Sequence, residues 1–274
     1  MKNRGGSEMI WWLTGACLCV GGCAATARNP EATPVVAAAP AVQVSPDVIQ
    51  AQVIAARVVG TVTQARGDRT APLKDNDSIA MGATVKTAAG SSIVLLFSNG
   101  ASVRLGPETE LVVEQFLQDP FSARVNLATL AEEPTVSRTH LRLVRGEIVG
   151  HVKGLKRAQG SSFSVRTPVG VMRFPADGES PIQGVGGAQV VRTTMPMSVE
   201  AATAIRQAPG AEAPHGWTGG TFRIFFRPLT DGTGAKFSLA SAAGSVAFAS
   251  PNGGREIQVT PGNELTVSAE VSRK

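Results

Sequence analysis

The sequence predicts an all-β protein in which antiparallel hairpins form a β-sandwich or a short irregular β-roll, preceded by a signal peptide and a disordered Pro/Ala linker. Three observations predict it. Apolar and polar residues alternate over many short runs, as they do on the two faces of a strand. The 274 residues include 30 glycines and 17 prolines, and many of these separate the runs as turns. Helical periodicity is almost absent.

The N-terminus has the pattern of a secretory signal. Lys2 and Arg4 precede the apolar run Met9 to Gly22, which is shorter than the roughly 20 residues that a membrane-spanning helix needs. The run ends in Val20-Gly21-Gly22-Cys23, which resembles a bacterial lipobox. The resemblance implies that residues 1–22 are removed and that Cys23 carries lipid and anchors the protein to a membrane. A plain secreted protein, or an inner-membrane protein that keeps this segment, is the alternative.

Residues 23–52 are expected to form an Ala/Pro-rich tether, of which Ala24 to Pro46 reaches ~60 Å when semi-extended. All 3 cysteines lie at or before position 23, so the folded body has no disulfide and relies on its core. Ala24 follows Cys23, which by analogy with a bacterial sorting rule favours the outer membrane, facing the periplasm or the cell surface.

The net charge is +5. For an exported protein, this small excess suits an envelope protein or an anionic glycan as partner better than nucleic acid. We expect no cofactor.

The first half of the body contains a series of expected strands and turns. Asp47 to Arg57 is a helical turn or a first strand, and Ser92 to Phe97 is buried on both faces. Asn99-Gly100 predicts a type I′ hairpin turn. The other expected strands are Val58 to Thr63, which a turn at Arg66-Gly67-Asp68 follows, then Ala101 to Leu105 and Thr109 to Glu114.

Gln115 to Ser137 is expected to be irregular. His140 to Lys153 predicts two strands that turn at Arg145-Gly146. In the next run, Pro168 and Gly170 are expected to form a corner where the chain passes between sheets, and Pro175 ends the strand because proline cannot donate to a ladder.

Residues 176–236 are expected to form an irregular insertion that contains a short helix, Ser198 to Gln207, with Ser198 as N-cap, and a strand at Thr221 to Arg227. The C-terminal strands, within residues 237–274, complete or extend the domain. They are Phe237 to Ala240, Ser245 to Phe248, Glu256 to Val259 and Glu264 to Ser268, the last pair separated by Pro261-Gly262.

Four ordered blocks resemble the FecR domain. They are VVGTVTQARG at 58–67, LKDNDSIAMGATVKTAAGSSIVLLFSNGASVRLGPETELVV at 73–113, THLRLVRGEIVGHVK at 139–153 and FSVRTPVGV at 163–171. The resemblance covers about Val53 to Arg173, and we set the FecR-like β domain at 53–175. The "V-R-G-T" block that follows in the family is replaced by Val171-Met172-Arg173-Phe174-Pro175.

In the family's iron-citrate regulators, this type of domain is joined to a transmembrane helix and a cytoplasmic portion that handles a sigma factor. By resemblance we expect a stand-alone, lipid-tethered version here. It would act as a non-catalytic interaction module. The alternative is extracytoplasmic signalling in trans with a separate anti-sigma factor. An enzyme acting on envelope polymers is the third class.

No catalytic or metal site is predicted. The histidines His140 and His151 are expected to face solvent on alternating strands, and Asp75-Asn76-Asp77 is expected to be a turn without a calcium ligand set.

One basic cluster is a candidate interaction patch: Arg138, His140, Arg142, Arg145, Lys153, Lys156 and Arg157. Alternation directs Leu141, Leu143, Ile148 and Val152 inward and Arg142 and Lys153 outward. The patch is either a solvated sheet face blunted by charge or a contact site for an acidic partner.

Overall fold

One long strand organises the fold, because β10 (Ser137–Val152) belongs to two sheets. Its first half pairs with β8 (Glu110–Gln118) and β11 (Ser162–Thr167). Its second half pairs with β7 (Ser102–Leu105) and β14 (Gly220–Pro228). This computed structural model describes residues 47–175, 191–208, 218–229, 234–250 and 256–270. The expected signal and Cys23 lie outside these residues.

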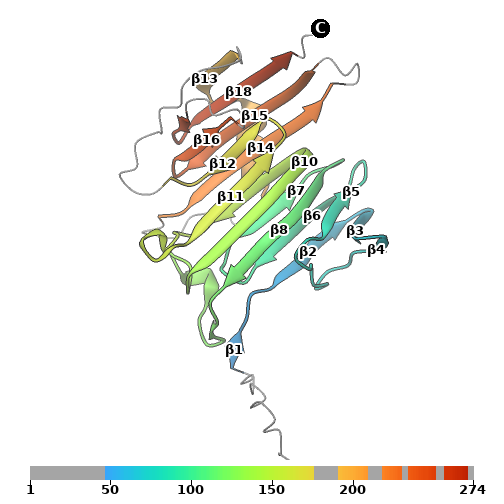
Figure 1. Cartoon of the computed structure of the whole chain (residues 1–274), viewed down its shortest axis with the longest axis vertical. Helices are drawn as coiled ribbons and strands as arrows, with labels where there is room; N and C mark the ends of the chain where they lie inside the picture. The colour runs from blue at the N-terminus through green and yellow to red at the C-terminus, as the bar shows by residue number, and fades with distance from the viewer. Residues whose placement is uncertain (1–46, 176–190, 209–217, 230–233, 251–255, 271–274) are drawn as a thin grey trace, which may run out of the picture. The chain divides into compact units, whose positions relative to one another are not determined.

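We call the two sheets sheet 1 and sheet 2; Figure 1 labels most of their strands. Sheet 1 runs in the order β4 (Arg69–Pro72), β3 (Val62–Arg66), β5 (Thr84–Thr87), β8, β10, β11, β12 (Gly170–Arg173), β16 (Val246–Ala249) and β17 (Ile257–Val259). Sheet 2 runs in the order β13 (Val191–Pro196), β18 (Asn263–Glu270), β15 (Gly234–Ala243), β14, β10, β7, β6 (Ser92–Phe97) and β2 (Val53–Val59). A separate two-stranded sheet joins β1 (Val48–Ile49) and β9 (Phe121–Ser122).

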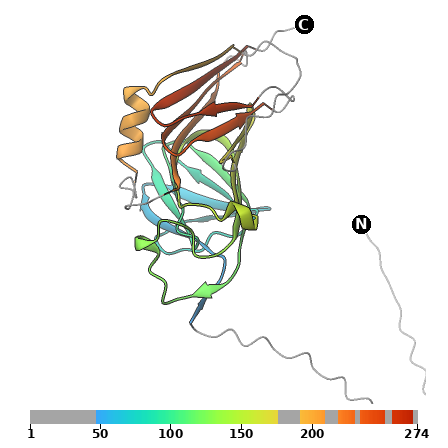
Figure 2. The same ribbon diagram turned by 90° about the vertical axis from the view of Figure 1, so that its left-hand side faces the viewer.

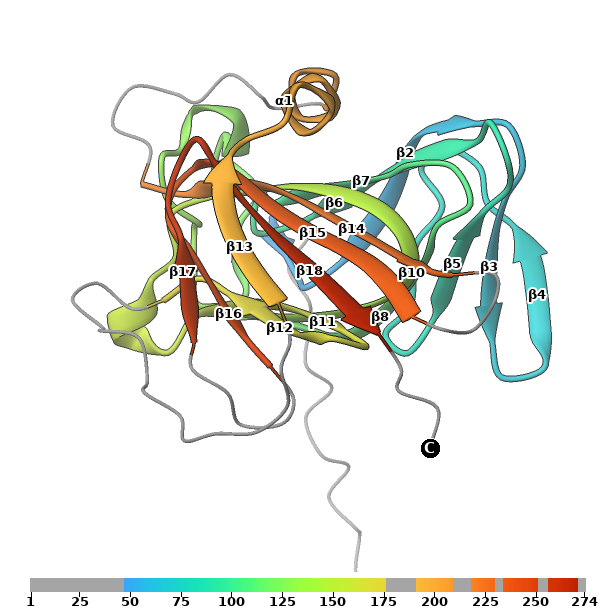
Figure 3. The same ribbon diagram turned by 90° about the horizontal axis from the view of Figure 1, so that it is seen from above.

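The two sheets lie as opposite layers (Figure 3), and apolar side chains fill the space between them. Aromatic pairs join the layers. The ring centroids are 5.1 Å apart for Phe97 and Phe116, 5.8 Å for Phe163 and Phe222, and 4.8 Å for Phe237 and Phe248. One core cluster takes residues from both sheets. The all-β prediction is therefore confirmed, in its sandwich form.

Only one α-helix is described, α1 (Val199–Arg206), which lies on the outside of the sandwich (Figure 2). As predicted, Ser198 is its N-cap, and the side chain accepts a hydrogen bond from the amide of Ala201. Two 3-10 turns, Leu127–Thr129 and Arg157–Gln159, occupy loops. Within the described ranges, no helix has the length and apolar character that crossing a membrane requires.

Arg145-Gly146 is not a hairpin turn, because β10 continues through it. Gly146 has φ +97° and marks the point where the strand passes from sheet 1 to sheet 2. A β-carbon here would overlap Thr109, so the crossing requires glycine. The Arg-Gly step predicts a turn because a glycine with positive φ is equally typical of a hairpin turn and of a bend within a strand.

Two other turns also differ from expectation. Thr167 to Gly170 joins β11 to β12 within sheet 1, so Pro168 and Gly170 belong to a hairpin, not to a corner between sheets. At Asn99-Gly100 the predicted hairpin between β6 and β7 forms, but only Gly100 has positive φ, at +85°. A type I′ turn requires positive φ at both residues, so this turn is of another type. The strand before Pro175 ends at Arg173, as expected.

Within 176–236, the expected strand at Thr221 to Arg227 forms as β14, a central strand of sheet 2, and a further strand that was not expected, β13, pairs with β18. Another segment expected to be irregular also contains strands. Within Gln115 to Ser137, β8 extends to Gln118 and β9 follows. Leu96, expected to be buried, is 43% exposed, whereas the other apolar residues of β6 are buried.

Candidate functional site

The arginine face is the outer surface of sheet 1 around Arg138, Arg142, Arg145, Arg166 and Arg173. It follows from alternation along β10: Leu141 and Leu143 are fully buried in the core, so the residues between them point outward. The side chains of Arg142, Arg145 and Arg166 are 45%, 58% and 62% exposed.

Strand pairing brings the arginines of neighbouring strands together. The described residues contain one parallel strand pair, β10 with β11, and its register places Arg142 beside Arg166 and His140 beside Ser164. β12 then adds Arg173 on the other side of β11. Arg166 and Arg173 were missed in the sequence. The alternation of Ser162 to Thr167 directs Arg166 outward, but no local pattern shows which strand lies next to it.

Carboxylates lie between the cations. Glu114, at a bulge of β8, pairs with Arg142 at 2.8 Å and with Arg166 at 3.9 Å. Glu110 pairs with Lys86 at 3.1 Å and with Arg145 at 3.6 Å. Each of these carboxylates therefore serves two cations.

The face keeps a positive excess. Arg173 is matched by Glu256, whose two oxygens lie 2.8 and 2.9 Å from its nitrogens. Among the remaining members, Glu110 and Glu114 oppose a larger set of cations, namely Lys86, Arg138, Arg142, Arg145 and Arg166. The arginine face thus presents more positive than negative charge.

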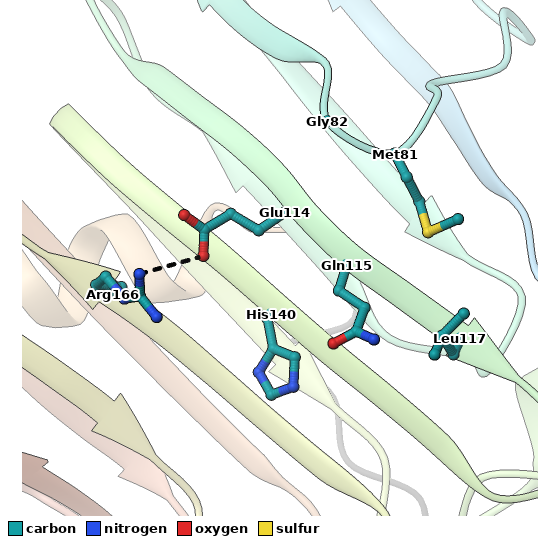
Figure 4. A pocket seen from close by; sticks show the side chains of 7 residues that line it. All are labelled: Met81, Gly82, Glu114, Gln115, Leu117, His140 and Arg166. Carbon is teal, nitrogen blue, oxygen red and sulfur yellow. Dashed lines mark ion pairs between the residues drawn. The ribbon is translucent and has the colours of Figure 1, made fainter.

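An open depression of about 690 Å³ lies on this face, between β8, β10, β11 and the turn before β5 (Figure 4). Figure 4 shows the Arg166–Glu114 pair at one side, Met81 and Leu117 at the other, and His140 with Gln115 between them. Met81 and Leu117 are 50% and 42% exposed. The depression therefore offers apolar contact beside charge.

The predicted patch divides into two groups in the structure. Arg138, His140 and Arg142 point outward from sheet 1, and Arg145 lies 3.6 Å from Glu110, just before β10 leaves sheet 1. Lys156 and Arg157 are half-buried in the loop before β11, where the amide of Lys156 donates to Glu133 Oε1 at 2.8 Å.

The prediction that Lys153 points to solvent is wrong. The side chain is buried, and its Nζ donates to the carbonyl of Leu130 at 2.7 Å. Burial lowers the pKa of Lys153. Strand alternation directed the side chain out of the core correctly, but the loop around Leu130 covers it.

The prediction that His151 faces solvent is also wrong. The residue is 6% exposed, and its Nδ1 lies 3.0 Å from Thr221 Oγ1. Burial, followed by the charge of Lys153, lowers the pKa of His151 to about 4. The imidazole is therefore neutral at ordinary pH.

His140 and Ser164 are the residues on the arginine face that come nearest to a reactive pair, with His140 Nδ1 2.8 Å from Ser164 Oγ. Acyl transfer by such a pair also requires a group that orients the imidazole and donors for the oxyanion. Among the described residues, no carboxylate makes a hydrogen bond or ion pair with His140. We interpret the contact as one that orients His140.

The other candidate motif is structural. Asp75 Oδ1 accepts the amide of Val58 at 2.8 Å, and Asp77 Oδ2 accepts the amide of Lys74 at 2.7 Å. Asn76 has φ +70°. These carboxylates hold a turn, as predicted, and among the described residues no three histidine, cysteine or acidic side chains gather as metal ligands do.

Comparison with known proteins identifies the segment that carries the arginine face. Residues 83–176 match the family model described as FecR protein. The match begins at residue 83 and not near Val53, so it takes in β5 through β12 and leaves out β2 to β4. Searches of curated proteins and of solved structures found no match. The chain therefore contains a FecR domain, and β8, β10 and β11 of this domain form the centre of the arginine face.

Proposed function

We propose that the protein is a non-catalytic lipoprotein of the cell envelope, whose FecR domain binds an acidic partner protein through the arginine face. The observation that supports this most directly is the excess of cations on an exposed sheet surface. Arginine suits such a role because its planar guanidinium pairs with carboxylates in a fixed geometry.

The ion pairs of the face do not prevent binding. Exposed pairs such as Arg142–Glu114 contribute only about 0–1 kcal/mol to stability, so a partner's carboxylates can take their place at little cost. Met81 and Leu117 add apolar contact at the depression. Glu110 and Glu114 lie among the cations and weaken the attraction of the face for a uniformly anionic polymer. The mixed charge therefore favours a protein.

Lipid attachment at Cys23 is the remaining part of the proposal. The lipobox-like Val20-Gly21-Gly22-Cys23 supports it, and the tether up to residue 52 would hold the domain away from the membrane. Metabolic labelling with a radioactive fatty acid tests it. We expect label in the wild type and none in Cys23→Ser. Equal labelling of both proteins would place any lipid elsewhere.

The binding surface is tested by crosslinking in cells with the full-length protein. A photoreactive amino acid at Leu117, in the depression, should give a discrete protein adduct. That adduct should disappear when Arg138, Arg142 and Arg166 are all changed to glutamine. The matched control changes Arg66, Arg69 and Lys74 to glutamine, which removes the same charge from the exposed β3–β4 hairpin and its following turn.

The outcomes separate the partner classes. An adduct that survives the Arg138, Arg142 and Arg166 changes contradicts the proposed surface. If no protein adduct forms and the purified protein instead binds an anionic envelope polysaccharide through the same arginines, the partner is a polymer and not a protein.

Signalling in trans with an anti-sigma factor is a narrower version that the FecR domain itself favours. It predicts that deletion of the gene changes the transcription of a discrete set of genes, and that the triple glutamine variant reproduces the change. A deletion without a transcriptional effect contradicts it and leaves the binding proposal standing.

A further inference from the structure

Helix α1 is tied to the outer face of sheet 2 by both polar and apolar contacts. Ile205 and Ala208 pack against Val149. Glu200 Oε1 lies 2.8 Å from Arg223 NH2, and the amide of Ser198 donates to Glu264 Oε2 at 3.1 Å. Burial raises the pKa of Glu264, but hydrogen bonds from Ser198 and Ser238 and the charge of Arg223 together lower it. Glu264 is thus a charged anchor for the start of the helix.

A cleft of about 370 Å³ remains between α1 and the end of β7. Its walls come from three elements: Arg104 from β7, Glu147 from β10, and Glu200, Thr203 and Gln207 from α1. Pro107 and Val199 supply small apolar surfaces. Polar groups from separate elements that converge on one hollow are the usual arrangement of a small-ligand site.

The sheet wall of the cleft carries a free cation. Arg104 is half-buried, and within the part of the chain that the structure describes its guanidinium has no ion pair or hydrogen bond. A guanidinium that is partly removed from water is stabilised by an anion in bidentate contact. Arg104 therefore provides a site for a carboxylate or a similar anion.

Two carboxylates also line the cleft, Glu147 on β10, the strand next to β7, and Glu200 on α1. Glu147 and Glu200 each use Oε1 to bind Arg223, at 3.0 and 2.8 Å. Glu264 is the third carboxylate near Arg223, at 3.9 Å, so one buried guanidinium faces three acids. Because Arg223 is shared among three carboxylates, Glu147 and Glu200 keep negative charge that favours a cationic group in the cleft.

We propose that the cleft between α1 and β7 binds a small zwitterion that carries a primary amine and a carboxylate, such as a free amino acid or a short peptide. The carboxylate binds Arg104, the ammonium group binds Glu147 and Glu200, and Thr203 and Gln207 hydrogen-bond the body of the ligand. A ligand with only one charge would meet an unmatched or opposing wall. The site is separate from the arginine face, which lies on sheet 1.

Binding would also join two elements, because the ligand contacts Arg104 on the sheet and Glu200 on the helix. Anything that binds the folded state alone stabilises it by mass action. A fitting zwitterion should therefore raise the unfolding temperature and protect the amides of α1 from hydrogen exchange.

The test uses the full-length protein and two measurements, isothermal titration and thermal unfolding. The probes are L-alanine, L-glutamate, L-lysine and the dipeptide Ala-Ala, which distinguish a free amino acid from a peptide. The matched single-charge controls are N-acetyl-L-alanine, which lacks the ammonium group, and L-alaninamide, which lacks the carboxylate.

We expect at least one zwitterion to bind and its single-charge analogues to bind at least tenfold more weakly. Arg104→Gln should weaken zwitterion binding at least tenfold, whereas Arg66→Gln, at an exposed site on β3, should leave it unchanged. No binding by any probe, equal binding by a single-charge analogue, or full binding by Arg104→Gln would each overturn the proposal. None of these outcomes affects the arginine face.

Discussion

Thr109 and Gly146 lie in direct contact where β10 crosses from one sheet to the other. Thr109 Oγ1 accepts a hydrogen bond from the amide of Glu147 at 2.9 Å. The same hydroxyl can donate to the carbonyl oxygen of Glu147, which lies 3.1 Å away. Residue 146 has positive φ, and a β-carbon on it would overlap the threonine. The passage of β10 from sheet 1 to sheet 2 therefore requires a glycine at position 146.

Gly146→Ala should destabilise the fold by more than about 2 kcal/mol, because the substitution combines an unfavourable φ with a steric overlap that the threonine cannot avoid. Gly67→Ala is the control. Gly67 also has positive φ, at +56°, but has no atom within 4 Å of the added β-carbon, so the change should cost about 1 kcal/mol. Urea unfolding followed by circular dichroism measures both. Equal losses would show that the overlap at Thr109 relaxes.

Phe222 joins the two sheets at the centre of the core. It is fully buried, and its ring centroid lies 5.8 Å from Phe163 and 5.9 Å from Phe174. Phe222→Ala should lower the free energy of unfolding by about 3–5 kcal/mol because it leaves a cavity among fixed neighbours.

The control for this variant is Phe225→Ala, on the outer face of the same strand, where the ring lies under Arg223 and Arg227. It loses a cation–π contact worth about 1 kcal/mol, without opening a core cavity. Similar losses in the two variants would mean that the sheets do not depend on the aromatic pairs.

Alternation and turn chemistry predicted many of the strands, but they did not predict which strands pair. Ser92 to Phe97, Thr221 to Arg227 and the Ser198-capped helix form where expected, because their signals are local. The continuous β10 and the parallel β10–β11 pair depend on strands distant in sequence. The Arg-Gly step predicts a turn when the sequence is considered alone, and only the pairing of β10 on both sides of Gly146 shows that the strand continues.

The candidate site was predictable to the same degree. Arg138 and Arg142 face outward, as their alternation indicates. Lys153 also points away from the core, but the loop at Leu130 covers its side chain. Burial of a side chain under a loop is not visible in the alternation of apolar and polar residues along the strand. Arg166 joins the face only through the register of β11.

Glu133 connects two loops beside the arginine face. The carboxylate is 2% exposed, and it accepts hydrogen bonds from the Ser137 hydroxyl and from the amide of Lys156. Glu133→Ala should cost about 1–3 kcal/mol because two buried donors lose their acceptor. Glu132→Ala, at an exposed neighbour, should change stability by less than about 0.5 kcal/mol. If both variants unfold at the same urea concentration, the buried contacts contribute nothing.

His151 should make stability depend on pH. Its pKa is about 4 in the folded protein and 6.5 as a model group, with burial as the main cause and Lys153 as the second. Between these values the unfolded chain binds more protons than the folded one, so stability is fully present above about pH 6.5 and is lost as pH falls toward 4. The loss attributable to this residue is at most about 3 kcal/mol.

His151→Asn removes the titrating group but keeps a side-chain amide near Thr221 Oγ1, with which His151 Nδ1 makes contact. We expect the variant to lose less stability than the wild type between pH 7 and pH 4.5, measured as the difference in free energy of unfolding in urea. A direct NMR titration of the imidazole checks the cause, since its signals should hold the neutral form down to about pH 5. If the free energy of unfolding falls with pH as steeply in the variant as in the wild type, the loss of stability in acid comes from carboxylates elsewhere and not from His151.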